Sequence, residues 1–129
     1  MILDASAVLA VIFGESDYPE INAAMNRASA LSMSAVNYLE AAIKIDGMGD
    51  PRLAAALEQL VAINGVAILP ATPHHAELAR EAYRRFGKGN HKARLNLGDC
   101  FAYALAKETG EPLLFKGDDF PQTDILAAL

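Results

Sequence analysis

The sequence predicts one α/β domain, spanning residues 1–129, in which a parallel sheet carries helices on both faces. Its length of 129 residues suffices for a single hydrophobic core but not for two full-sized domains. Apolar residues make up 53% of the chain and charged residues 21%, a balance typical of a packed core. Short apolar runs alternate with longer helical patterns, which is typical of parallel strands joined by crossover helices.

The first half of the chain opens with a short apolar run, and a helical segment closed by Gly14 follows it. In a later helix, Val36, Leu39 and Ile43 recur at spacings of three and four. These three side chains share one helical face, which we expect to be buried, and Glu40 lies on the opposite edge. The expected elements are a strand over 1–3, helices over 5–13 and 18–28, a strand over 30–33, and a helix ending near residues 47–49.

The second half repeats this alternation. Asp50 with Pro51, and Thr72 with Pro73, are caps followed by first-turn prolines that open two helices. Two glycines, two asparagines and several basic residues predict an exposed loop over 87–96. The remaining expected elements are a strand over 66–69, a helix that starts at 96–99 and runs through 105, a last central strand over 112–115, and a turn over 117–119.

Acidic residues follow the expected strand ends. Asp4 directly follows the first strand, Asp118 and Asp119 follow the last one, and Asp99 opens a helix. Ligand sites in parallel α/β sheets form beyond the carboxyl ends of the strands, so we expect these acids in one crevice, with Glu40 leaning over it. Two carboxylates about 4 Å apart repel by about 4 kcal/mol at an effective dielectric constant near 20, so this cluster needs a cation.

The acids of this cluster indicate a hard divalent ion. Oxygen ligands without histidine or thiolate favour Mg²⁺ or Mn²⁺. Such an ion polarises a phosphate oxygen, lowers the pKa of a bound water and stabilises a leaving oxygen. The sequence therefore predicts hydrolysis of a phosphodiester without a covalent protein nucleophile.

Four segments together resemble VapC-type PIN-domain toxins, and the resemblance covers essentially the whole chain. They contain an Asp-x-Ser near the start, a helical Glu, a Gly-Asp before an Ala-rich helix and a Gly-Asp-Asp-Phe turn, within 1–7, the helix of Glu40, 97–106 and 112–120. The resemblance implies a PIN-like, Rossmann-like fold and an endoribonuclease that uses Mg²⁺ or Mn²⁺. It also implies a VapB-like antitoxin, whose tail places a cation among the carboxylates, and a homodimer.

The resemblance assigns roles to individual residues. It implies that Asp4 and Asp99 are the principal metal ligands and that Glu40 is a ligand or a base outside the ligand set. Ser6 resembles the family's small polar residue that hydrogen-bonds a carboxylate or a metal-bound water. A common family pattern ends the last strand with Thr-x-Asp or Thr-x-Asn, whereas this chain has Phe-Lys-Gly at 115–117. The fourth acid is therefore Asp119 or Asp118, and the Asp-Phe pair at 119–120 favours Asp119.

The net charge of −5 alone argues against a nucleic-acid partner, because phosphates repel an acidic surface. The distribution of charge alters this conclusion, because no Asp or Glu occurs between Glu81 and Asp99. We call the five basic residues of this interval the basic strip and expect it to contact RNA phosphates, the alternative being a solvated loop. The basic strip consists of Arg84, Arg85, Lys88, Lys92 and Arg94.

Several features predict a cytoplasmic protein without a membrane span. No apolar stretch reaches the roughly 20 residues that cross a bilayer, and no basic segment precedes an apolar run at the start. The single cysteine, Cys100, fits a reducing compartment and is expected to be a buried thiol. We expect the three histidines to be surface residues without metal-ligand spacing.

Each acid also has a structural interpretation. Asp4 and Asp99 could cap helices, Glu40 could pair with Lys44, and Asp118 and Asp119 could be turn residues. Two other functions compete with the nuclease. One is a noncatalytic binding module with the same fold. The other is a haloacid-dehalogenase-like phosphatase, which needs a second acid two residues after the first, where Ser6 stands.

Overall fold

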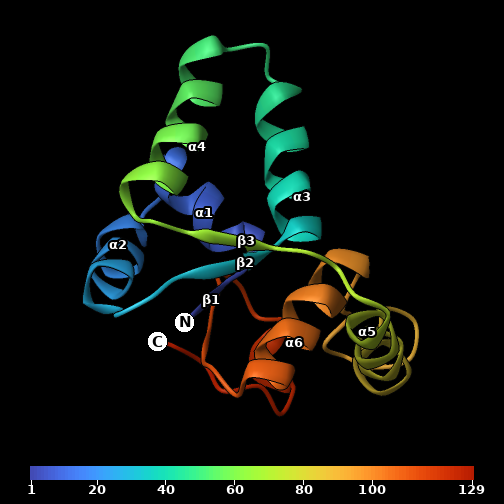
Figure 1. The fold of residues 1–129 in the computed structure, drawn as a ribbon. Helices are drawn as coiled ribbons and strands as arrows, with labels where there is room; N and C mark the ends of the chain where they lie inside the picture. The colour runs from blue at the N-terminus through green and yellow to red at the C-terminus, as the bar shows by residue number, and fades with distance from the viewer.

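The computed structural model describes residues 1–129 and contains a four-stranded parallel sheet in the order β3-β2-β1-β4 (Figure 1). This sheet confirms the predicted fold class. The strands are β1 (Ile2–Leu3), β2 (Ser32–Ser34), β3 (Ala67–Leu69) and β4 (Leu113–Leu114). The helices are α1 (Ala5–Ile12), α2 (Tyr18–Arg27), α3 (Ala35–Asp46), α4 (Pro51–Ile63), α5 (Pro73–Phe86), α6 (Leu97–Thr109) and the 3-10 helix η1 (Phe120–Gln122).

The sheet separates two hydrophobic cores, because successive residues of a strand face opposite sides. Leu3, Met33 and Leu114 join a cluster of 17 buried residues with side chains from α1 to α4. Ile2 and Leu113 join a second cluster of 14 buried residues, in which α5 and α6 supply most of the partners. Figure 1 shows α3 and α4 rising together on one side of the sheet, with α5 and α6 on the other.

Both predicted caps are present, and a third helix start also has one. Asp50 accepts a hydrogen bond from the backbone N of Arg52 at the start of α4, and Thr72 accepts one from the backbone N of His75 at the start of α5. Asn96 caps α6, which extends to Thr109, beyond the expected end at 105. These side chains accept bonds from backbone N–H groups that have no partner inside the helix.

The prediction of a central last strand is wrong, because β4 is the outermost named strand of the sheet. Both residues of β4 are buried, which makes the strand look central in the sequence. Its outer edge is covered by the end of the chain. The backbone N of Leu113 donates to the carbonyl of Leu126 at 2.8 Å, and the backbone N of Ala128 donates to the carbonyl of Leu113 at 2.9 Å.

The prediction of a buried stripe on α3 is also wrong. Leu39 and Ile43 are 56% and 64% exposed. The buried residues of α3 are Asn37, Ala41 and Ile45, which recur at a spacing of four. Glu40 is not on an edge opposite the apolar residues, because it lines one groove together with Leu39 and Ile43. The apolar residues of α3 therefore face outward beside Glu40.

His75 departs from the expectation that all three histidines are surface residues. Its side chain is buried, its Nε2 contacts the carboxylate of Glu108 of α6, and its Nδ1 completes the cap of α5 by accepting a hydrogen bond from the backbone N of Thr72 at 3.4 Å. His74 is exposed, as predicted. Cys100 is buried, which confirms its prediction, and the helices are all too short or too polar to cross a membrane.

Candidate active site

Four carboxylates predicted from the sequence line one cavity of about 170 Å³, which we call the carboxylate cavity. Asp4 follows β1, Glu40 lies on α3, Asp99 lies in the first turn of α6, and Asp119 follows β4. The cavity therefore lies at the carboxyl ends of the two neighbouring strands β1 and β4, where ligand sites of parallel sheets form. Asp118 is exposed and does not line it.

Asp119 is placed by the buried residue that follows it. Phe120 is buried, and its ring lies 5.0 Å from the ring of Phe115, centroid to centroid. The backbone carbonyl of Asp118 accepts a hydrogen bond from the Gln122 side chain, while the Asp118 carboxylate has no protein partner. The structure therefore brings Asp119, rather than Asp118, to the other three acids.

Asp4 is a buried carboxylate and also the cap of α1. Its Oδ2 accepts hydrogen bonds from the backbone N of Ser6 at 3.0 Å and from the Ser6 hydroxyl at 2.5 Å. That hydroxyl accepts a bond of 3.0 Å from the backbone N of Lys116, just beyond β4. Burial raises the pKa of Asp4, and the bonds from Ser6 oppose this rise. Ser6 thus connects Asp4 to the end of β4.

Asp99 is bound into the start of its own helix. The backbone N of Asn96 donates to Asp99 Oδ2 at 3.0 Å, and the backbone N of Asp99 donates to Asn96 Oδ1 at 2.9 Å. This reciprocal arrangement is a capping box, and it leaves Asp99 Oδ1 without a protein partner. Burial raises the pKa of Asp99 to about 7, and the charges of Asp4, Asp119 and Glu40 contribute to the rise.

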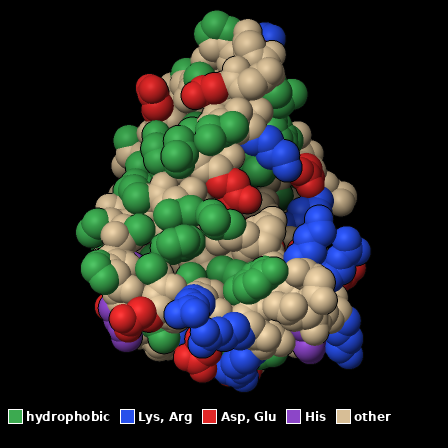
Figure 2. All heavy atoms as spheres, turned by 90° about the vertical axis from the view of Figure 1, so that its right-hand side faces the viewer, with side chains coloured by type: hydrophobic (Ala, Val, Ile, Leu, Met, Phe, Trp, Pro, Cys, Tyr) green, Lys and Arg blue, Asp and Glu red, His purple; other side chains and the backbone are tan.

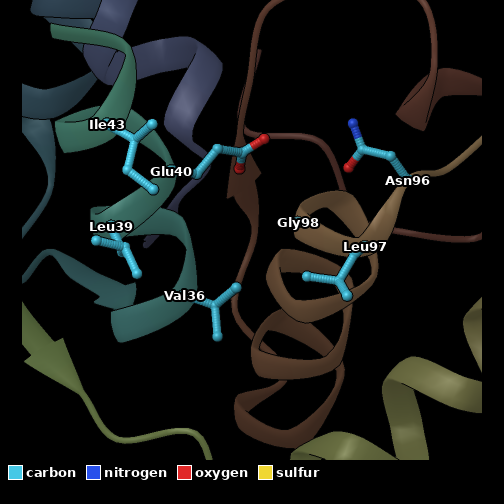
Figure 3. Close-up of a pocket in the computed structure, with 7 residues that line it drawn as sticks. All are labelled: Val36, Leu39, Glu40, Ile43, Asn96, Leu97 and Gly98. Atoms are coloured by element: carbon cyan, nitrogen blue, oxygen red, sulfur yellow. The ribbon is translucent and has the colours of Figure 1, made fainter. Parts of the chain in front are cut away.

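Glu40 extends from α3 toward the first turn of α6, as Figure 3 shows. Burial raises the pKa of Glu40, and the charge of Asp4 adds to this effect. The structural alternative of an ion pair with Lys44 is absent, because Lys44 forms no salt bridge. The Glu40 carboxylate instead packs against Gly98, directly before Asp99.

Sequence reasoning missed Asn37, which is completely buried between these acids. Its Nδ2 donates to the carbonyl of Gly98 at 2.9 Å and lies 3.4 Å from Glu40 Oε2 and 3.5 Å from Asp4 Oδ1. Its Oδ1 is buried without a hydrogen-bond partner, which costs about 1–3 kcal/mol. The only signal in the sequence is an asparagine one helical turn before Glu40.

Two lysines also line the carboxylate cavity, Lys44 and Lys116. The Lys116 ammonium forms ion pairs with Glu15 and, at 2.9 Å, with Asp17, both in the connection between α1 and α2. Hydrogen bonds to these two carboxylates raise the pKa of Lys116. Its charge is therefore balanced by acids outside the cluster, so the carboxylates of Asp4 and Asp99 lack a protein cation partner.

The residues of the carboxylate cavity fit a divalent ion by their chemistry. As the side chains stand, no three acids, histidines or cysteines are arranged to hold one ion, so binding requires the carboxylates to draw together. Three of the four acids have raised pKa values because they are buried near like charges, and a cation would relieve this repulsion. The all-oxygen donor set matches Mg²⁺ or Mn²⁺.

The basic strip is on the surface. Arg84, Lys88, Lys92 and Arg94 are exposed, whereas Arg85 donates to Asp124 at 3.4 Å and lies over the ring of Phe86. Figure 2 shows basic side chains along the lower and right-hand margins of the face that it draws. The structure thus leaves four of the five basic side chains free of ion pairs with the protein.

An apolar band crosses the same face of the molecule (Figure 2). Leu39 and Ile43 of α3 and Leu97 of α6 are exposed apolar side chains, and Leu97 is 71% exposed. Figure 3 shows these three side chains along one groove of about 400 Å³, with Glu40 at its edge. Leu97 also borders a second groove of about 430 Å³ between α5 and α6, whose lining includes the small side chains of Ala76 and Ala79.

Comparison with protein families and curated sequences identifies close relatives. A sequence model described as the PIN domain matches residues 1–126. Ribonuclease VapC42 of Mycobacterium tuberculosis is 42% identical over 129 residues, covering 99% of this chain and 98% of the relative. Ribonuclease VapC of Mycolicibacterium smegmatis is 43% identical over 128 residues, covering 98% of both chains. These matches extend over nearly the whole chain.

Solved structures show the same fold at low sequence identity. Mycobacterium tuberculosis VapC20, described as a toxin that cleaves the sarcin-ricin loop, aligns with a TM-score of 0.78 at 17% identity, covering 97% of this chain and 95% of that one. A chain of a toxin-antitoxin complex from Klebsiella pneumoniae aligns with a TM-score of 0.71 at 14% identity, covering 99% and 97%. The chain therefore belongs to the PIN-domain family and, within it, to the VapC ribonucleases.

Proposed function

We propose that the protein is a metal-dependent endoribonuclease and the toxin of a toxin-antitoxin pair. The observation that carries this proposal is the convergence of Asp4, Glu40, Asp99 and Asp119 on one cavity from four separate segments. Names of relatives that match along the entire chain support the ribonuclease activity. The identity of the metal, the RNA contacts and the partners described below are parts of the proposal.

The carboxylates have distinct tasks in this proposal. Asp4, Asp99 and Asp119 hold Mg²⁺ or Mn²⁺, which when bound supplies the Lewis acidity that activates water and stabilises the leaving oxygen. Ser6 keeps Asp4 Oδ2 in place through its two hydrogen bonds. Glu40 completes the ligand set or accepts the proton of the attacking water, and its position beside Gly98 brings it to the edge of the cavity.

The test is cleavage of an end-labelled RNA by purified protein with Mg²⁺, with Mn²⁺ and with excess chelator. We expect cleavage only with a divalent ion, and loss of cleavage in Asp4→Asn and Asp99→Asn. The matched control is Asp46→Asn, which changes an exposed acid at the end of α3 and should cleave like the wild type. Cleavage in chelator, or by the Asp4 and Asp99 variants, would contradict the mechanism.

Two other functions are separated by the same assays. A noncatalytic binding module would retain RNA without cleaving it under any metal condition. A haloacid-dehalogenase-like phosphatase would need an acid at the position of Ser6, whose hydroxyl is instead committed to Asp4 and to the backbone of Lys116. Release of phosphate from a small phosphomonoester would favour the phosphatase over the nuclease.

We further propose that an antitoxin inhibits the enzyme by inserting a cationic side chain into the carboxylate cavity. The lack of a protein cation partner for buried Asp4 and Asp99 supports this, because an arginine there would favour their ionised forms and make charge-assisted hydrogen bonds with them. A neighbouring gene for a small protein with an arginine-bearing tail would supply the candidate. Its co-purification should abolish RNA cleavage, and replacement of that arginine by alanine should restore it. Full inhibition by the alanine variant would contradict this mode of binding.

A second copy of the chain is the partner that we propose for the apolar band. The groove lined by Leu39, Ile43 and Leu97 shares Leu97 with the groove lined by Ala76 and Ala79. The two grooves form one exposed apolar surface, which pairing with the same surface of a second copy would bury. Sedimentation should give a dimer for the wild type and a monomer for Leu39→Glu. The control Ile63→Glu changes an exposed residue of α4 that lines neither groove and should remain dimeric.

The proposed site of action is the cytoplasm, where RNA and a cotranslated antitoxin are available. The basic strip would hold the phosphate backbone of the substrate there, because Lys and Arg side chains supply most sequence-independent affinity for nucleic acids. Fractionation of cells that carry a tagged, inactive Asp4→Asn protein tests this assignment. Recovery of the protein in the membrane or periplasmic fraction would contradict it.

A further inference from the structure

Asn37 is the one buried side chain that contacts the segments of three active-site acids. Its Nδ2 lies within 3.5 Å of Asp4 Oδ1 beyond β1 and within 3.4 Å of Glu40 Oε2 on α3. The same atom donates to the carbonyl of Gly98 at 2.9 Å, directly before Asp99. Asn37 thus bridges the end of β1, the helix α3 and the first turn of α6.

The hydrogen-bond geometry shows what this bridge does. An amide nitrogen carries two hydrogens, and the short bond to Gly98 uses one of them. The other is shared between two carboxylate oxygens at longer distances. Asn37 is therefore anchored to α6 and presents its remaining N–H to Asp4 and Glu40 together. A donor between two carboxylates weakens their mutual repulsion, and Glu40 keeps Oε1 without a hydrogen bond to the protein.

A role in packing alone does not account for an asparagine at this position. The other buried residues on this face of α3, Ala41 and Ile45, are apolar. Asn37 Oδ1 has no hydrogen-bond partner, so an apolar side chain of similar volume would avoid the cost of burying an unpaired oxygen. Packing alone would therefore favour an apolar residue such as leucine at position 37.

We infer that Asn37 is a positioning residue that holds Asp4, Glu40 and the Asp99 turn in the arrangement that admits the metal. This inference rests on the proposed function. Asn37 does not touch the substrate, and it acts through the two carboxylates and the carbonyl of Gly98. Without its N–H, Asp4 and Glu40 repel each other without a donor between them, and α6 loses one connection to α3.

The experiment compares Asn37→Leu, Asn37→Ala and Asn37→Asp with the wild type in the full-length protein. Calorimetric titration with Mn²⁺ measures metal binding, thermal unfolding in chelator measures stability, and RNA cleavage gives kcat and KM. We expect Mn²⁺ affinity to fall about 10- to 100-fold in Asn37→Leu, as for other groups that orient metal ligands, with a lower kcat and an unchanged KM. Asn37→Asp should also have a lower kcat, because its carboxylate cannot donate a hydrogen bond to Asp4 and Glu40.

Asn64 provides a matched control. Its Nδ2 donates to the carbonyl of Leu60 at 2.8 Å at the end of α4, away from the acids. Asn64→Ala removes an equally short bond to a backbone carbonyl, so it should lower the unfolding temperature and leave Mn²⁺ affinity unchanged. A purely structural Asn37 would follow the same pattern.

The outcomes separate this inference from the function on which it rests. Wild-type Mn²⁺ affinity and kcat in Asn37→Leu, or in Asn37→Ala if the leucine variant does not fold, would overturn the inference and leave the nuclease intact. A wild-type protein that neither binds Mn²⁺ nor cleaves RNA would overturn the proposed function and the inference with it. Weakened Mn²⁺ binding by folded Asn37 variants, with Asn64→Ala unaffected, would support it.

Discussion

The carboxyl group of Glu40 occupies the space in which a side chain on Gly98 would begin. A Cβ atom on Gly98 would lie 2.7 Å from Glu40 Cδ and 2.9 Å from Glu40 Oε1. Real Cβ atoms do not approach other heavy atoms so closely, so any other residue at position 98 must push the carboxyl group away. The glycine before Asp99 therefore determines where Glu40 can lie.

Gly98→Ala should displace Glu40 and lower kcat by about 10- to 100-fold, the range for loss of ligand positioning. Stability should change little, because the displaced atoms end a flexible side chain and alanine favours helix over glycine by about 1 kcal/mol. Cleavage kinetics and urea unfolding measure the two effects. In a Glu40→Gln background the alanine should add little further loss of kcat, since coupled sites are not additive. Full additivity would indicate that Gly98 acts independently of Glu40.

Variants of Asp118 and Asp119 test which of the two residues acts together with Asp4, Glu40 and Asp99. Asp119→Asn should lower kcat by at least about 10-fold, because Asp119 lines the carboxylate cavity and is one of the proposed metal ligands. Asp118→Asn should retain wild-type kcat, because its exposed side chain does not line the cavity. Single-turnover cleavage at saturating Mn²⁺ measures both. The reverse order of effects would assign the role to Asp118.

The metal-free protein should lose stability as pH rises. Burial raises the pKa of Asp99 from 3.8 to about 7, so the unfolded chain releases its proton first and the native state binds more protons between these values. The free energy of unfolding therefore falls from about pH 4 to about pH 7 and levels off above that. The raised pKa values of Asp4 and Glu40 act in the same direction.

Urea unfolding in chelator across this pH range measures the effect. Asp99→Asn removes one of the titrating groups, so its stability should depend less steeply on pH than that of the wild type. A free energy of unfolding that increases with pH in the same window would show that Asp99 is not held in its protonated form by burial.

The basic strip should affect RNA binding more than the chemical step. Lys88→Glu and Lys92→Glu should raise KM with little change in kcat, and each lost phosphate contact should reduce the salt slope of binding by about 1. Arg85→Ala should instead lower stability, because Arg85 is engaged with Asp124 and Phe86. Cleavage kinetics at several salt concentrations distinguish the two groups. An unchanged salt slope in the lysine variants would show that the basic strip does not contact the RNA phosphates.

The fold and the acids were predictable because each depends on local pattern. Strand ends followed by Asp4 and Asp119, and a cap before Asp99, are visible as short runs of residues. The placement of Asp119 over Asp118 follows from buried Phe120, which the Asp-Phe resemblance indicated. These features depend only on residues that are neighbours in the sequence, so they can be predicted from it.

The wrong predictions concern which side chains of a helix are buried and which strand forms the edge of the sheet. Both depend on residues that are distant in the sequence. The spacing of Leu39 and Ile43 is typical of a buried stripe, but α3 buries the smaller Asn37 and Ala41 because α6 and α1 approach it closely. His75 is buried between α5 and α6, where it contacts Glu108, which lies 33 positions away in the sequence. No local pattern distinguishes a buried asparagine or histidine from an exposed one, so Asn37 and His75 could not be placed.

The pairing between Leu113 and the backbone of residues 126–128 affects how readily the protein aggregates. An uncovered outer strand offers free amide and carbonyl groups to other chains and promotes aggregation. These last residues occupy that position on β4, yet none of them borders the carboxylate cavity. Removal of residues 126–128 would therefore leave the carboxylate cavity unchanged and expose the outer edge of β4. We expect such a shortened protein to aggregate before it loses activity.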